Sequence, residues 1–192
     1  MPHATSLAQR LRALLLQRRT AALATLSAEP PEQGEGAAAP CASMVPYAID
    51  AHSGTLVLHL SGLAAHTRQL GLHPLASLLV VSPEPEQGPV HALERVTLQV
   101  RAHTPERNSA AWHAARTAYL ARFPEAAFMM ELGDFRLVCL TLLAARHIAG
   151  FGAARDVPAD ELRTTLQQCA MDATDGTSAP AAPPKDHVPP GS

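Results

Sequence analysis

Lysine is almost missing from this sequence. Of its fifteen basic residues fourteen are arginines, and the one lysine is Lys185, near the C-terminus. A compositional bias of the genome produces the same pattern. In either case, a folded core without lysine cannot form a lysine Schiff base or supply the lysine of a P-loop. Any anion must therefore be bound by arginine side chains, hydroxyl groups or backbone N–H groups.

Aromatic residues and net charge are also scarce. Aromatic residues make up 4% of the chain, and Tyr47 is the only one before residue 111. The net charge is −2 and the isoelectric point is about 6.5. The sequence therefore has neither the positive charge nor the row of aromatic side chains with which proteins bind nucleic acid. No stretch approaches the roughly 20 apolar residues of a membrane-spanning helix. We therefore predict a protein that binds neither nucleic acid nor a membrane.

Cysteine is rare and widely spaced. Cys41, Cys139 and Cys169 form no C-x-x-C pair. This spacing supports neither a zinc ribbon nor a disulfide framework. Reduced thiols are typical of the cytoplasm, which is the location we predict.

Several catalytic signatures are absent. The sequence contains neither G-x-S-x-G nor H-E-x-x-H, and the run at 150–152 lacks the third glycine of the dinucleotide fingerprint. His59, His66 and His73 are spaced by seven residues, but that spacing crosses a strand-to-helix boundary. It does not predict a metal site, because ligand clusters usually have tighter spacing.

The distribution of apolar residues predicts six strands and a few helices. Strands are expected at residues 21–26, 41–49, 55–61, 77–82, 95–101 and 135–148, the last as one bent strand or two. Helical spacing is found at residues 7–15, 63–72, 105–122 and 156–168. Strands 41–49 and 55–61 are expected to form a hairpin. Because the strands follow one another through short turns, we predict a mainly β (α+β) fold, an antiparallel barrel with peripheral helices.

Two segments are too rich in proline, alanine and glycine to pack. Residues 28–40 form a low-complexity loop that we expect to be flexible. Residues 169–192 form a Pro/Ala-rich tail that we expect to be disordered. The predicted organisation is therefore one barrel domain, residues 1–168, followed by this tail.

The stretch from Leu56 to Leu70 has the residues of an anion site. A predicted strand ends at Ser61 and a helix begins within three residues, with His66, Thr67 and Arg68 in its first turns. The amide groups and dipole at a helix N-terminus attract phosphate, and an arginine adds a bidentate clamp. An ordinary serine cap beside a solvated polar face would give the same pattern.

Two strands carry further candidate binding residues. Arg95 and Thr97 share the polar face of strand 95–101. An arginine there either pairs with an anionic group or lies at a solvent-exposed edge of the sheet. Pro46 lies inside strand 41–49 and indicates an edge or bulge with free backbone groups. Such groups beside an apolar wall can orient a flat heteroaromatic ligand.

Taken in order, these segments resemble a known superfamily. They read ALATL (22–26), CASMVPYAID (41–50), LHLSGLAAHTRQL (58–70), ASLLV (76–80), ERVTLQV (94–100), RTAYLARFPEA (116–126), GDFRLVCL (133–140) and AGFGAAR (149–155). Together they are similar to the FMN-binding split-barrel superfamily of pyridoxamine 5′-phosphate oxidase, over about residues 7–155. Within it, the HugZ-type heme-utilisation branch is the most similar.

The resemblance implies a six-stranded antiparallel split β-barrel that forms a homodimer, with FMN or heme in two clefts between the protomers. It implies that residues of strand 41–49 line the cofactor ring. It places the phosphate at the start of the second helix, with two residues of strand 95–101 approaching it. The residues concerned are Ser43, Val45, Pro46, Tyr47, Ser61, His66, Thr67, Arg68, Arg95 and Thr97.

For the heme branch, the resemblance implies other roles. Arg95 would lie on the distal side of the heme, and Asp134 would support the proximal histidine. That histidine follows the G-F-G segment in the heme branch, where this chain has only His187. No other metal ligand is expected.

Three functional hypotheses follow. The first is an FMN-dependent oxidoreductase acting on a small molecule that the sequence does not name. The second is a heme-binding or heme-degrading protein. The third is a barrel dimer without a cofactor that acts as an interaction module.

Overall fold

The computed structural model describes residues 2–27 and 38–175 of the chain. The predicted loop 28–40 lies mostly outside these ranges. His187 and the tail from residue 176 also lie outside the described residues, so the division into barrel and tail stays a prediction.

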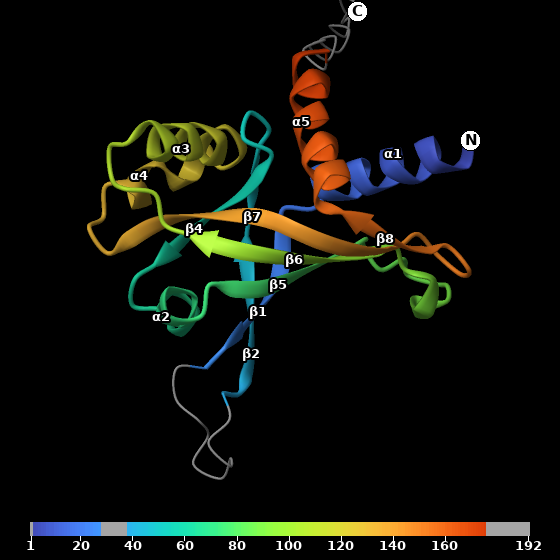
Figure 1. Cartoon of the computed structure of the whole chain (residues 1–192), viewed down its shortest axis with the longest axis horizontal. Helices are drawn as coiled ribbons and strands as arrows, with labels where there is room; N and C mark the ends of the chain where they lie inside the picture. The colour runs from blue at the N-terminus through green and yellow to red at the C-terminus, as the bar shows by residue number, and fades with distance from the viewer. Residues whose placement is uncertain (1, 28–37, 176–192) are drawn as a thin grey trace, which may run out of the picture.

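In the described residues, eight strands form one antiparallel sheet, and helices lie around it (Figure 1). The strands are β1 (Thr20–Leu26), β2 (Pro40–Pro46), β3 (Ala48–Asp50), β4 (Thr55–Ser61), β5 (Leu75–Val81), β6 (Arg95–His103), β7 (Phe135–Ile148) and β8 (Ala154–Pro158). The helices are α1 (Pro2–Gln17), α2 (Ala65–Leu72), α3 (Ala110–Arg122), α4 (Ala127–Met130) and α5 (Ala159–Asp175), with short 3₁₀ turns at Val90–Ala92 and Pro124–Ala126. The mainly β antiparallel prediction is confirmed.

The strand count differs from the predicted six. The predicted strand 41–49 is two strands, because the chain changes neighbour between Pro46 and Ala48. β2 pairs with β1, whereas β3 pairs with β4. Pro46 has no N–H for the ladder, and the N–H of Tyr47 turns to the carbonyl of Arg19, 3.1 Å away. The predicted hairpin is therefore confined to β3 and β4. β8, which pairs with the end of β7, is the other strand that we did not predict.

The strand order is β2-β1-β5-β6-β7-β4-β3. β7 is fourteen residues long and pairs with β4, β6 and β8. The last helix continues to Asp175, beyond the predicted boundary at residue 168. None of the helices within the described ranges is both long and apolar enough to cross a membrane.

Two hydrophobic clusters hold the sheet. The larger cluster joins one side of the sheet to α1 and α5, through residues such as Leu15, Leu98 and Leu162. The smaller cluster lies under α3, where Tyr119 and Leu137 are buried. The helices α3 and α4 thus cover one end of the sheet, and α1 and α5 cover another part (Figure 1).

Part of the sheet keeps an exposed apolar surface. The register aligns Met44, Ala22, Leu79 and Thr97 in one row across β2, β1, β5 and β6. All four are exposed in the structure, Met44 to 70% and Leu79 to 38%. We call this row and its neighbours Ala42, Ala24, Ser77 and Gln99 the open face.

Candidate functional site

The start of α2 brings together residues from distant parts of the chain. The Nδ1 atom of His66 lies 3.2 Å from the hydroxyl of Ser43, which is on β2. Burial lowers the pKa of His66, so the ring is neutral at neutral pH and can both donate and accept a hydrogen bond. The fold thus brings a residue predicted at the cofactor ring next to one predicted at the phosphate.

Ser61 connects this helix to the loop before β7. Its hydroxyl donates to Oδ2 of Asp134, 3.1 Å away, and its carbonyl accepts from the hydroxyl of Thr67 at 2.6 Å. The N–H of Gly62 donates to the carbonyl of Asp134 at 2.6 Å. These bonds place the carboxylate of Asp134 beside the first turn of α2. The hydroxyls of Ser61 and Thr67 are thus used in hydrogen bonds within the protein, which connect the end of β4 with the loop of Asp134 and with α2.

The cationic group at this site is exposed. Arg68 donates to the carbonyl of Leu63 at 2.8 Å and has no ion pair within the described residues. The N-cap residue of α2 is Ala64, whose side chain cannot cap the helix. The first amide groups of α2 therefore lack a side-chain acceptor and, together with Arg68, favour an anion.

Three of the predicted ring-lining residues are placed differently. Val45 and Tyr47 are buried in the larger core cluster, 1% and 0% exposed, and Pro46 is half-buried beside them. The hydroxyl of Tyr47 donates to the carbonyl of Leu15, 2.8 Å away. The side chains of Val45 and Tyr47 therefore do not reach the site at α2. The cause is the period of two in a strand, which points them to the same side as the barrel core.

Arg95 and Thr97 also lie away from α2. Arg95 is paired with Ile148 at the end of β7, whereas Ser61 is paired with Phe135 at its beginning. Fourteen residues of strand at ~3.3 Å per residue separate these ends by roughly 40 Å. Within one protomer, the expected approach of Arg95 and Thr97 to the α2 site is therefore not found.

An apolar hollow of about 330 Å³ lies next to the open face, where β1 and β5 separate after only three paired residues. It is lined by Ala24, Thr25, Leu26, Pro40, Leu75, Ala76, Ser77, Gln99, Val100 and Leu143. Sequence reasoning missed this surface. The signal was present, because Leu75–Val81 is apolar at both strand faces, which is typical of a strand covered on both sides.

Metal ligands do not gather in this structure. Within residues 2–27 and 38–175, no three histidine, cysteine, aspartate or glutamate side chains come close enough to bind a metal ion together. The one histidine that the resemblance suggested as an iron ligand, His187, lies outside these ranges.

Two curated proteins are similar to this chain. One is the heme oxygenase HutZ of Vibrio cholerae, 31% identical over 147 residues, which are 76% of this chain and 78% of HutZ. The other is the chloroplast heme oxygenase HOZ of Arabidopsis thaliana, 36% identical over 116 residues, which are 60% of this chain and 33% of HOZ. No protein-family model matches the chain.

Solved structures agree with these relatives. A heme-binding protein of Mycobacterium smegmatis superimposes with a TM-score of 0.69 and 29% identity, over 82% of this chain and 60% of that one. The putative pyridoxamine 5′-phosphate oxidase of Listeria innocua, 14% identical, shares the fold with a TM-score of 0.53, over 75% of this chain and 99% of that one.

The chain belongs to the HugZ/HutZ branch of the pyridoxamine 5′-phosphate oxidase-like split-barrel superfamily. The resemblance seen in the sequence is thereby confirmed. The chain spans about a third of the Arabidopsis relative and 60% of the mycobacterial structure, so it matches a part of these longer proteins.

The expectation of FMN is corrected by these comparisons. Three of the relatives at 29% identity and above are named for heme, two as heme oxygenases and one as a heme-binding protein. The sequence motifs could not separate the two cofactors, because an anion site at a helix N-terminus suits a phosphate and a carboxylate alike.

Proposed function

We propose that this protein is a homodimeric oxidoreductase that binds heme between its two protomers and degrades it as a heme oxygenase. The observation that carries the proposal is the position of Arg95 and Asp134. The resemblance assigns them to the two sides of one heme, yet β7 holds them roughly 40 Å apart in one chain. A single heme can meet both residues only if each comes from a different protomer.

The open face supports the same arrangement. Met44 and Leu79 would lose their contact with water if a second copy of the chain packed against this face. Burial of apolar surface contributes about 25 cal/mol per Å², so such a row favours association. Because Thr97 belongs to the open face and Arg95 shares its strand, a partner on this face comes close to Arg95.

The residues fit the chemistry of heme. The porphyrin is a flat apolar ring with two carboxylates, and the apolar hollow beside the open face and the cationic Arg68 and Arg95 match these two properties. When bound, heme would supply an iron centre that activates oxygen. Arg95 would contribute charged N–H donors, and Asp134 would accept a hydrogen bond from a histidine that holds the heme, for which the resemblance suggests His187.

The test is a subunit-mixing experiment. We expect Asp134→Asn and Arg95→Gln to weaken hemin binding separately, measured by titration of the Soret band. A mixed dimer of the two variants has one site with both native residues and one site with neither. A purified mixed dimer should therefore have about half of the tight sites of the native dimer, and an unseparated equimolar mixture about a quarter.

Other outcomes would contradict the proposal. If mixing restores nothing while the variants form mixed dimers, the two residues do not share a site between protomers. A full-length preparation that takes up no hemin at all would favour the interaction module instead. Loss of the Soret band in His187→Ala would identify the axial ligand, and its retention would clear His187 of that role.

We also propose that the protein acts in the cytoplasm. Among the described residues no disulfide joins the three cysteines, as is usual in a reducing compartment.

A further inference from the structure

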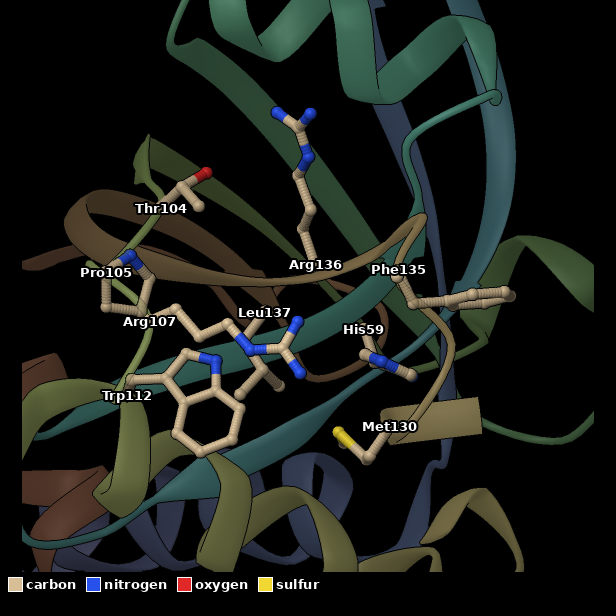
Figure 2. A pocket seen from close by; sticks show the side chains of 10 residues that line it. His59, Thr104, Pro105, Arg107, Trp112, Met130, Phe135, Arg136 and Leu137 are labelled. Carbon is tan, nitrogen blue, oxygen red and sulfur yellow. The ribbon is translucent and has the colours of Figure 1, made fainter. Parts of the chain in front are cut away.

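A second cavity lies on the part of the sheet covered by α3 and α4, away from the open face. It encloses about 280 Å³ between β4, β7 and the loop that leads into α3 (Figure 2). Polar and apolar atoms contribute about equally to its walls, and none of the residues that line it is acidic. The side chains that matter are His59, Arg107, Trp112, Met130, Phe135 and Leu137.

His59 is a buried polar side chain without a partner. It is only 8% exposed, yet no hydrogen bond reaches its ring nitrogens within the described part of the chain. Its ring only packs against Tyr119 at 5.5 Å and Phe135 at 4.9 Å between centroids. Burial lowers the pKa of His59, so it offers one donor and one acceptor into the cavity. Its ring nitrogens are not among the fully buried unpaired atoms of the described residues, so a ligand in the cavity can reach them.

The positively charged side chain that extends over this cavity is that of Arg107. Its guanidinium lies 6.0 Å from the centre of the Trp112 ring and extends over the cavity toward His59 in Figure 2. Arg107 is exposed and forms no ion pair with any described residue. Arg136 also borders the cavity, but its side chain points away toward α2 in the same view. One cation without an ion pair therefore faces the cavity, and Asp134, whose charge acts on His59, is not among the residues that line it.

We propose that this cavity binds a small aromatic carboxylate that carries a second polar group. The carboxylate pairs with Arg107, the aromatic ring packs against Trp112 and Leu137, and the second polar group bonds to His59. An arginine fork matches a carboxylate geometrically, and aromatic walls match a flat ring. The volume is just below the roughly 300–1,000 Å³ of pockets for drug-sized ligands, so a tetrapyrrole is too large for it.

The only tryptophan of the chain makes the test direct. Because Trp112 lines the cavity, its fluorescence should be quenched in a saturable way by 4-hydroxybenzoate added to the full-length protein. We expect Arg107→Gln to raise the Kd by about tenfold or more, as for the loss of a charge-assisted bond. Arg163→Gln removes the same charge from the exposed face of α5 and should leave the Kd unchanged.

The second polar group is tested with benzoate, which lacks the hydroxyl. The native protein should bind 4-hydroxybenzoate more tightly than benzoate, and His59→Phe should abolish that preference. Quenching that never saturates, or an equal Kd in native protein and Arg107→Gln, would overturn the proposal. So would displacement of bound hemin by 4-hydroxybenzoate, because the cavity would then belong to the heme site. The titration is done without hemin as well, so its result does not depend on heme binding.

Discussion

The Nε2 atom of His147 lies 2.9 Å from Oε1 of Glu94, and the ring of His147 has no exposed surface. The other carboxylate oxygen of Glu94 accepts from Arg10 at 3.1 Å. Arg10 also donates to the carbonyl of Ala149 at 2.5 Å. Hydrogen bonds among Arg10, Glu94 and His147 thus connect α1 to the end of the sheet where β6, β7 and β8 meet.

This contact predicts a loss of stability in mild acid. Burial lowers the pKa of His147, and the hydrogen bond and charge of Glu94 oppose that shift only in part. Since the folded state disfavours the charged ring, the unfolded state binds more protons once the pH falls below about 6.5. The free energy of unfolding should be highest above that pH and should decrease as the pH falls toward the folded-state pKa. Burial lowers the pKa values of His59 and His66 as well, which adds to the effect.

Urea unfolding at several pH values between about 7.5 and 5.5 measures this dependence. The variant His147→Gln should have a flatter profile than the native protein. His113→Gln, on an exposed position of α3, should keep the native profile. Identical slopes for all three proteins would show that His147 does not contribute.

Gly62 is predicted to tolerate no side chain. A Cβ atom there would lie 2.8 Å from the carbonyl oxygen of Asp134, which the N–H of Gly62 already approaches to 2.6 Å. Gly62→Ala must move the loop of Asp134, and we expect a cost of about 1–3 kcal/mol in unfolding free energy. Hemin affinity should fall with it. Gly71→Ala is the matched control, because nothing lies within 4 Å of its Cβ and alanine favours the helix by up to about 1 kcal/mol. A native-like Gly62→Ala would contradict the close packing seen here.

Tyr47 is predicted to contribute through its hydroxyl to the docking of α1. Tyr47→Phe leaves the carbonyl of Leu15 without this donor in a buried place, at a cost of about 1–2 kcal/mol. Tyr119 is also buried, but no hydrogen bond reaches its hydroxyl within the described residues. Tyr119→Phe should therefore cost less, and denaturant unfolding of both variants compares them. Equal losses would mean that the bond to Leu15 contributes nothing of its own.

Leu79 is predicted to lie in the contact between protomers. Leu79→Glu places a charge in the middle of the open face, so we expect monomers in size-exclusion chromatography with light scattering. Hemin binding should be lost together with the dimer. Thr117→Glu, on the exposed side of α3, adds the same charge and should change neither property. A monomeric variant with native hemin affinity would place the heme within one chain.

The local pattern of the sequence was enough for most of the elements. Alternation identified Arg95–His103 and a short apolar run identified the β1 strand, both to within a few residues. The break at Pro46 was visible only as an irregularity. Its meaning depends on which strand each side pairs with, and pairing partners are far away in sequence.

Some of the predicted binding residues lie in the core and others on the surface, for a similar reason. Alternation tells which residues share a strand face, but it does not tell which face becomes the core. Val45 and Tyr47 therefore went to the interior. β2, which contains Val45, also carries Met44, which is on the open face.

By itself, the sequence determined the antiparallel β class, the dependence on arginine for any anion, and the branch of the superfamily. These follow from composition, from the period of side chains along a strand, and from short motifs. Only the tertiary structure decided that Arg95 and Asp134 lie at opposite ends of β7, that the open face remains uncovered, and that His59 and Arg107 meet at one cavity. The physical reason is that a distance between two side chains depends on the whole sheet order, which no local pattern contains.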